Sequence, residues 1–92
     1  MRSNSILIYY KPSNSNVSRL GISASKKFGN AVKRNKLKRI VREYFRISTL
    51  KNSGFDILVV ANNRFTKQKE PLSEKQIFFI REDLAKLFKK IV

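Results

Sequence analysis

Apolar residues near the start of the chain recur at every second position, which is the period of a β-strand. The first such segment runs from Ser5 to Lys11 (SILIYYK), and the second from Arg19 to Lys26 (RLGISASK). Between them, Pro12–Ser18 (PSNSNVS) is rich in turn-forming residues. Two strands joined by a turn of this kind predict a β-hairpin.

The pattern then changes to the 3.6-residue period of a helix. Asn30 is a good N-cap, so we expect the helix to begin at Ala31. The expected end lies between Ile47 and Leu50, before the turn residues Asn52–Gly54. An apolar stripe at the i, i+3, i+4, i+7, i+8 positions predicts packing on a core, and it consists of Leu37, Ile40, Val41, Tyr44 and Phe45.

A third strand is predicted from Phe55 to Asn62 (FDILVVAN). Its residues from Ile57 to Ala61 are apolar on both faces, which is typical of a strand covered on both sides. A polar loop, Asn63–Pro71, follows. This loop leads into the last predicted element.

The last element is a helix with several start signals. Ser73 and Gln76 form a capping box, and Leu72 can pack on Ile77 as a hydrophobic staple. The apolar stripe of this helix consists of Ile77, Ile80, Leu84, Leu87, Phe88 and Ile91. The element order β-β-α-β-α predicts an α+β fold, with a small mixed β-sheet packed by two helices in a single domain, residues 1–92.

Composition excludes several classes of function. The 92 residues contain no Cys and no His, so disulfides, thiolate metal sites and the usual acid–base group are excluded. No uncharged apolar run is longer than Ile6–Tyr10, which is far too short to span a membrane or to form a signal-peptide core. We therefore expect a cytoplasmic protein with no membrane partner.

The net charge is extreme for so small a domain. The chain has 21 Lys and Arg against 6 Asp and Glu, a net charge of +15. Solubility requires a net charge of about 2–8, and the excess destabilises the compact state by self-repulsion. A polyanionic partner is the simplest reason for it, although an inert basic surface is the alternative.

The charge is concentrated between Ser25 and Arg46, where nine of 22 residues are Lys or Arg and Glu43 is the one acid. Projected at ~100° per residue, one face of the predicted helix carries the apolar stripe. The opposite face carries a narrow polar row, which we call the basic ridge and which consists of Asn35, Arg39, Arg42 and Arg46, flanked by Lys36 and Lys38.

This arrangement is costly for the isolated chain. Lys33, Arg34 and Lys36 crowd the positive end of the helix dipole, where each cation costs roughly 0.3–1 kcal/mol at low salt. An ordinary solvated helix face mixes charges of both signs. A bound polyanion would reverse these costs. Free backbone N–H groups at the helix start could then hold a phosphate together with Lys26, Lys27 and Lys33.

The polyanion could be DNA, RNA or lipid. A membrane-surface helix would expose its apolar stripe, which this small domain needs for its core. No helix-turn-helix spacing is present, whereas arginine forks suit the irregular phosphates of RNA. The composition therefore favours RNA over DNA. Nonspecific DNA compaction remains an alternative.

The stretch SASKKFGNAVKRNKLKRIVREYFR resembles the RNR signature of the bacterial ribonuclease P protein family. The matching pieces are Lys26-Lys27, Gly29-Asn30-Ala31-Val32, Arg34-Asn35, Lys38-Arg39 and Arg42. The strands ILIYYKP and GFDILVVAN and the final helix also correspond to the family, so that the resemblance spans almost the whole chain. It implies a left-handed βαβ crossover through the basic helix, contrary to the usual right-handed rule.

The resemblance also implies a function. The chain would be the accessory protein subunit of the endoribonuclease ribonuclease P, with one protein bound per ribonuclease P RNA. It would bind the catalytic RNA and the 5′ leader of precursor tRNA, while the RNA subunit cleaves the leader with its own Mg²⁺ ions. The alternative is a non-catalytic ribosomal or other structural RNA-binding protein.

Site residues follow from the motif and the helix start. The predicted RNA contacts are Lys26, Lys27, Lys33, Arg34, Asn35, Lys38, Arg39, Arg42 and Arg46. By resemblance, the leader cleft would contain Tyr9 and be bordered by Lys38 and Arg42. The remaining aromatic residues are expected in the core rather than as base platforms, and they are Tyr44, Phe45, Phe78, Phe79 and Phe88.

No catalytic residue or metal site is expected in the protein itself. The six acids are scattered, and Glu82 and Asp83 are adjacent on a helix, so that they point in different directions. The family also has a helix before the first strand, which covers the sheet. Met1 lies almost on that strand here, so we expect an open sheet face, an exposed apolar patch beside Tyr9 and weaker leader binding.

Overall fold

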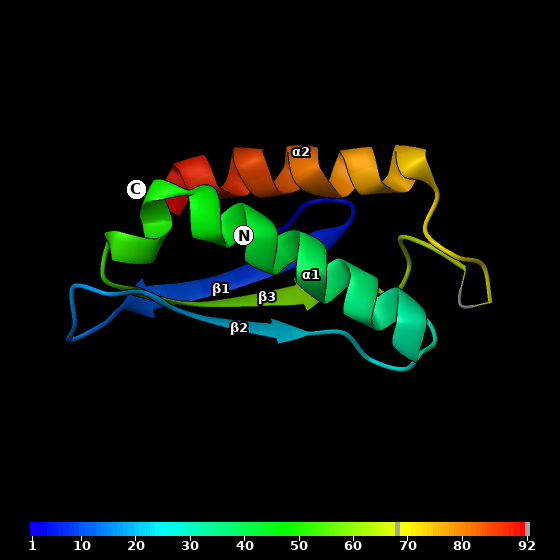
Figure 1. Cartoon of the computed structure of the whole chain (residues 1–92), viewed down its shortest axis with the longest axis horizontal. Helices are drawn as coiled ribbons and strands as arrows, with labels where there is room; N and C mark the ends of the chain where they lie inside the picture. The colour runs from blue at the N-terminus through cyan, green and yellow to red at the C-terminus, as the bar shows by residue number, and fades with distance from the viewer. Residues whose placement is uncertain (68, 92) are drawn as a thin grey trace.

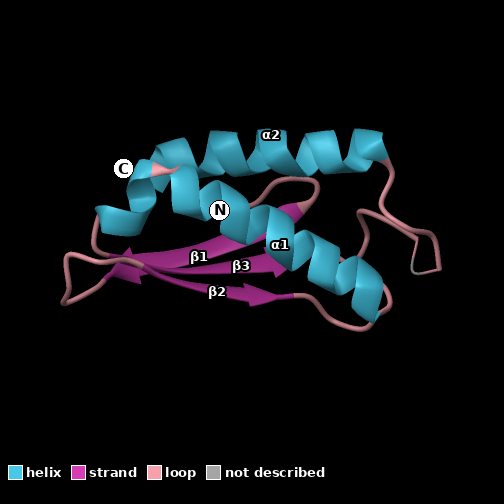
Figure 2. Cartoon of the chain, in the orientation of Figure 1, coloured by secondary structure: helices cyan, strands magenta, loops and turns pink. Residues whose placement is uncertain are grey.

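The computed structural model describes residues 1–67 and 69–91 (Figure 1). Both helices lie on one face of a single sheet, as Figure 2 shows, which confirms the predicted α+β class with a small mixed sheet. The elements in chain order are β1 (Ile6–Pro12), β2 (Arg19–Ser23), α1 (Ala31–Ile47), the 3₁₀ turn η1 (Thr49–Asn52), β3 (Phe55–Ala61) and α2 (Glu74–Ile91).

The sheet has the strand order β1-β3-β2, so β1 and β2 are not neighbours and the predicted hairpin is wrong. β3 lies between them, antiparallel to β1 and parallel to β2. The β1–β2 turn bonds instead to the segment that leads into β3: Ser13 N donates to Gly54 O at 2.8 Å, and Ser18 N donates to Lys51 O at 2.8 Å. These bonds hold the two strands apart by the width of β3.

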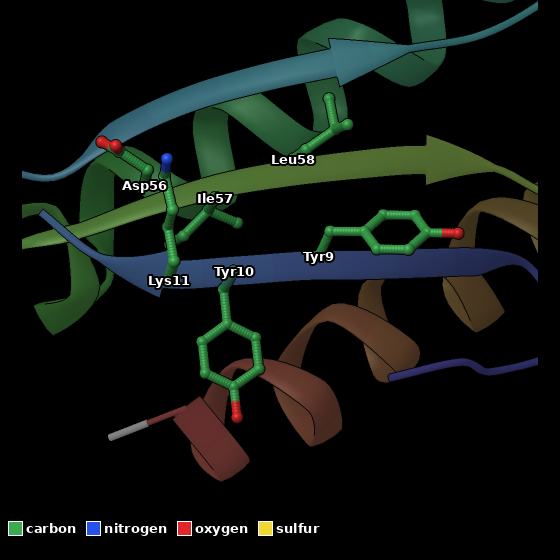
Figure 3. Close-up of a pocket in the computed structure, with 6 residues that line it drawn as sticks. All are labelled: Tyr9, Tyr10, Lys11, Asp56, Ile57 and Leu58. Atoms are coloured by element: carbon green, nitrogen blue, oxygen red, sulfur yellow. The ribbon is translucent and has the colours of Figure 1, made fainter.

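The connection from β2 through α1 to β3 is left-handed, as the resemblance implies. In Figure 3 the helices lie behind the sheet, β2 and β3 point in the same direction, and β3 lies below β2. A right-handed connection through a helix behind the sheet would have brought β3 above β2. The basic helix is therefore positioned by an uncommon topology.

The core lies between the sheet and the two helices. α1 lies over β2 and α2 over β1. The inner face of the sheet contributes Ile6, Ile8, Ile57, Val59 and Ala61, and the helices contribute Leu37, Ile40, Val41, Ile80, Leu84, Leu87 and Phe88. All of these side chains are buried.

The outer face of the sheet is not covered by either helix. Tyr9 and Leu58 are partners across β1 and β3, and their side chains are 58% and 40% exposed. The expectation that β3 is covered on both sides is therefore wrong, because its apolar run supplies one buried face and one open face.

The predicted helix starts are confirmed. Asn30 caps α1, its side-chain oxygen accepting a hydrogen bond from Lys33 N at 2.9 Å. Before α2, Ser73 N donates to Gln76 Oε1 at 2.9 Å, and Gln76 N donates to Ser73 Oγ at 3.1 Å. These reciprocal bonds form a capping box, which satisfies backbone donors that the helix leaves free.

Candidate nucleic-acid interface

The basic ridge points away from the core, as the projection predicts. Leu37, Ile40 and Val41 fix the inner face of α1, and the ridge residues Asn35, Arg39, Arg42 and Arg46 are all exposed. The Nε atom of Arg39 lies 4.0 Å from a carboxylate oxygen of Glu43, and both side chains are largely exposed. Such a pair contributes little and does not neutralise the ridge.

The turn before α1 extends the positive surface toward the helix start. Lys26 and Lys27 are exposed there, just before the Asn30 cap. Arg34 is half-buried, and its Nε is shielded from water without a hydrogen-bond partner among the described residues. A buried donor without an acceptor carries a desolvation cost, and the contact of Arg34 with RNA stays a prediction.

Lys33 does not fit its predicted role as an RNA contact. Its side chain is only 4% exposed, and its Nζ donates to Thr66 Oγ1 and to the Lys67 carbonyl oxygen, both at 2.6 Å. The ammonium also lies 5.4 Å from the centroid of the Phe28 ring. Burial lowers the pKa of Lys33 below its usual 10.5, against a smaller opposite effect from Glu70.

Lys33 therefore joins the start of α1 to the loop after β3. The helix projection contained this signal, because Lys33 precedes Leu37 by four residues and so shares its buried face. The high total charge of the segment favoured the prediction that Lys33 is exposed and contacts RNA. In this structure the Lys33 ammonium is therefore occupied by protein oxygens.

The open face of the sheet contains the predicted leader residue Tyr9 (Figure 3). A hollow of about 260 Å³ is lined there by Tyr9, Tyr10, Lys11, Asp56, Ile57 and Leu58. Tyr9 lies along the sheet, whereas Tyr10 points past its edge. The exposed apolar patch expected beside Tyr9 is thus confirmed.

An ion pair closes one end of this face. The guanidinium of Arg19 donates two hydrogen bonds of 2.8 Å to the carboxylate of Asp56. These bonds lower the pKa of Asp56 below its usual value, and the nearby positive charges add to that effect. The face therefore offers aromatic and aliphatic surface next to a carboxylate that stays ionised.

The structure does not bring all predicted cleft residues together. Lys38 is half-buried and Arg42 exposed on α1, and neither lines the hollow that contains Tyr9. Tyr9 lies on β1, whereas α1 lies over β2 at the opposite edge of the sheet. The predicted site residues therefore form two surfaces, the basic ridge and the open sheet face.

The prediction for the aromatic residues is wrong at two positions. Phe78 is 57% exposed and Phe79 is 42% exposed on α2, with ring centroids 5.9 Å apart. Phe88 is buried and meets Tyr44 edge to face at 5.6 Å. The two phenylalanines lie outside the buried stripe of α2, so their spacing is the signal that the sequence interpretation missed.

Asp83 has a structural role. Its Oδ2 accepts hydrogen bonds from both the hydroxyl and the backbone N–H of Ser5, and so joins α2 to the start of β1. Within residues 1–67 and 69–91 there is no group of three or more His, Cys, Asp or Glu that could hold a metal. In the same part of the chain, neither helix is long and apolar enough to cross a membrane.

Taken together, an open mixed sheet, a left-handed crossover and an outward ridge of arginines define a small α+β RNA-binding protein. A family model described as Ribonuclease P matches residues 1–92. The chain belongs to this family, that of the accessory protein of the endoribonuclease ribonuclease P, and so associates with ribonuclease P RNA. In this family catalysis resides in the RNA subunit.

Individual relatives of the chain belong to the same family. The chain is 40% identical over 87 residues to the ribonuclease P protein component of Fusobacterium nucleatum, covering 94% of this chain and 76% of that protein. It is 44% identical over 81 residues to the component of Desulforapulum autotrophicum, covering 87% of this chain and 63% of that protein. The chain therefore spans between about two thirds and three quarters of their lengths.

Solved structures show the same fold. The RNase P protein of Thermotoga maritima matches with a TM-score of 0.78 at 35% identity, covering 100% of this chain and 82% of that one. The Staphylococcus aureus RNase P protein matches with a TM-score of 0.77 at 30% identity, covering 99% of this chain and 78% of that one.

Proposed function

We propose that the basic ridge is the surface that binds ribonuclease P RNA, and that the open sheet face holds the 5′ leader of precursor tRNA. The observation that carries the proposal is the one-sided exposure of Asn35, Arg39, Arg42 and Arg46, on the face opposite the buried side chains of Leu37, Ile40 and Val41. Successive ridge residues lie about one turn apart, ~5.4 Å, which is comparable to the spacing of phosphates along an RNA strand.

The two surfaces have different chemistry. The ridge offers guanidinium groups, which bind phosphates through paired donors. The sheet face offers Tyr9 beside Leu58, a platform on which an unpaired base of a leader can stack. A folded RNA and a single-stranded extension can therefore bind at the same time.

The chemistry of cleavage does not involve side chains of this protein in the proposal. The side chains of both surfaces position the RNA and screen its charge, and Mg²⁺ bound by the RNA subunit supplies the activated water. Because the protein lowers the repulsion between the two RNA molecules, its contribution should be largest when Mg²⁺ is scarce.

Reconstitution tests this function. The protein is mixed with bacterial ribonuclease P RNA at low Mg²⁺, and cleavage of precursor tRNA is measured with leaders of one nucleotide and of several nucleotides. We expect stimulation of cleavage that increases with leader length. The absence of stimulation would refute the proposal and favour a structural RNA-binding protein. Equal affinity for duplex DNA at the same salt concentration would favour nonspecific DNA binding.

A further inference from the structure

A groove lies between the C-terminal half of α1 and the facing residues of α2. It consists of two hollows of about 390 and 360 Å³ that share the side chains of Tyr44 and Ile47. Volumes of this size are typical of sites for small organic groups. We call it the interhelical groove.

The floor of the interhelical groove is apolar and partly open to solvent. Ile47 is 81% exposed, which is unusual for a β-branched aliphatic side chain at the end of a core helix. Tyr44 is half-buried, and its ring is fixed by the edge-to-face contact with Phe88. The groove thus presents a rigid aromatic ring beside an exposed aliphatic side chain.

The rim of the groove is mainly basic. Arg46 lines one hollow together with Arg81 of α2, and Lys89 of α2 lines the other. Glu43 is the one acid among the lining residues of the two hollows. Three cations against one carboxylate favour an anionic occupant.

Arg46 belongs to both the basic ridge and the rim of the interhelical groove. Any RNA strand that follows the ridge to its C-terminal end therefore reaches the groove without crossing a neutral surface. This continuity distinguishes an RNA occupant from an acidic protein, and the basic rim disfavours a second copy of this chain. The latter would bring fifteen net positive charges against fifteen more.

We propose that the interhelical groove binds an unpaired nucleotide of the RNA that occupies the ridge. The base lies on Tyr44 and Ile47, and Arg46, Arg81 and Lys89 bind the flanking phosphates. The inference rests on the proposed function, since it requires RNA on the ridge. Aromatic and aliphatic surfaces accept any base face, and basic side chains at the rim follow the backbone.

Glu43 adds a preference among bases. A carboxylate in the groove accepts hydrogen bonds from an exocyclic amino group, which adenine, cytosine and guanine have and uracil lacks. We therefore expect the bound nucleotide to carry an amino group, and Glu43→Gln to weaken that preference.

The first test uses the absence of cysteine from the chain. The variants Ile47→Cys, Val32→Cys and Val17→Cys each carry a single thiol at an exposed apolar position, and each is labelled with an iron chelate that cleaves nearby RNA. Val32 lies at the start of the ridge helix, and Val17 lies in the β1–β2 turn. Each labelled protein is bound to ribonuclease P RNA, and the cleaved nucleotides are mapped.

We expect Ile47→Cys to cleave one short unpaired stretch of the RNA strongly, and Val32→Cys to cleave a neighbouring stretch. If Val32→Cys cleaves while Ile47→Cys gives only the background seen with Val17→Cys, the groove is empty and the inference is wrong, but the proposed function stands. If no position cleaves and no complex forms, the proposed function itself has failed.

The second test measures affinity with matched controls. We expect Ile47→Asp to weaken binding of ribonuclease P RNA by roughly 5- to 10-fold, at the lower end of what loss of one stacked base costs. Val17→Asp introduces the same charge at another exposed β-branched residue and should have little effect on RNA affinity. Arg81→Gln should lower the slope of log affinity against log salt by ~0.7–0.9, the value of one phosphate contact. Lys86→Gln removes another exposed charge of α2 and should leave the slope unchanged.

Two results would overturn the inference. One is equal affinity of Ile47→Asp and Val17→Asp for the RNA. The other is self-association of the free protein, measured by sedimentation, that Ile47→Asp abolishes, because the groove would then be an interface between two copies of the chain.

Discussion

A Cβ atom added to Gly29 would lie 2.3 Å from the Cδ atom of Lys33. The lysine side chain folds back over the glycine, so that its ammonium reaches the loop after β3. Gly29 is thus required by close approach, because any other residue would displace the side chain that joins α1 to this loop.

Gly29→Ala should therefore destabilise the protein. Overpacking at a buried contact typically costs about 1–3 kcal/mol, and we expect a loss of that size in the free energy of unfolding, measured in urea. Gly21→Ala is the matched control, since its added Cβ would lie 3.3 Å from Leu58 Cδ1 on the open sheet face. Equal losses in the two variants would show that the Lys33 side chain yields without cost.

Lys33 should make stability depend on pH in the alkaline range. Burial lowers its pKa in the folded state below the unfolded value of 10.5, so the unfolded chain binds more protons between those two values. The free energy of unfolding should therefore rise, relative to Lys33→Met, as the pH increases from neutrality toward 10.5. Urea titrations of both proteins at several pH values measure it. A difference that stays constant with pH would contradict this prediction.

Arg39→Ala combined with Arg42→Ala should weaken RNA binding and flatten its dependence on salt. Each lost phosphate contact lowers the slope of log affinity against log salt by ~0.7–0.9. Thermal stability should stay level or increase, because repulsion along the ridge falls. The double variant Lys86→Ala and Lys90→Ala removes two exposed charges from α2 and should change the slope much less. Unfolding of the ridge variant would mean that the ridge is structural.

Tyr9→Ala should affect the leader and not the ribozyme. Its side chain is 58% exposed, so its removal should change stability little. The free energy of binding precursor tRNA with a leader should become weaker by about 1–3 kcal/mol, the contribution of one base stacked on an aromatic ring. Affinity for tRNA without a leader should be unchanged, as should both affinities of Phe79→Ala, which removes an exposed aromatic ring of α2. Full leader dependence in Tyr9→Ala would exclude the sheet face as the leader site.

Much of the local structure could be predicted because it depends on neighbouring residues. The Asn30 cap and the Ser73–Gln76 capping box involve side chains three residues from their backbone partners. The basic ridge follows from helical periodicity once Leu37 and Val41 are assigned to the core. These features need no information about the rest of the fold.

Other features depend on contacts between distant parts of the chain. The turn Pro12–Ser18 contains ordinary hairpin residues, yet Ser18 N bonds to Lys51 O and β3 separates the two strands. The sequence predicts Lys33 on the charged surface because the loop at Thr66 and Lys67, which buries it, lies more than thirty residues away. Residue type alone predicts Phe78 and Phe79 in the core, but it does not say where neighbouring elements lie.

The residue pattern along α1 is enough to predict which surface of the helix is basic and which is buried, since a helix fixes the direction of each side chain by position alone. The motif between Lys26 and Arg46 also identified the family. Three features required the folded structure: β3 separates β1 from β2, Lys33 is buried, and Arg46 and Arg81 line the same groove. Each of these depends on long-range packing, whose outcome is set by the sum of many contacts and not by any local pattern.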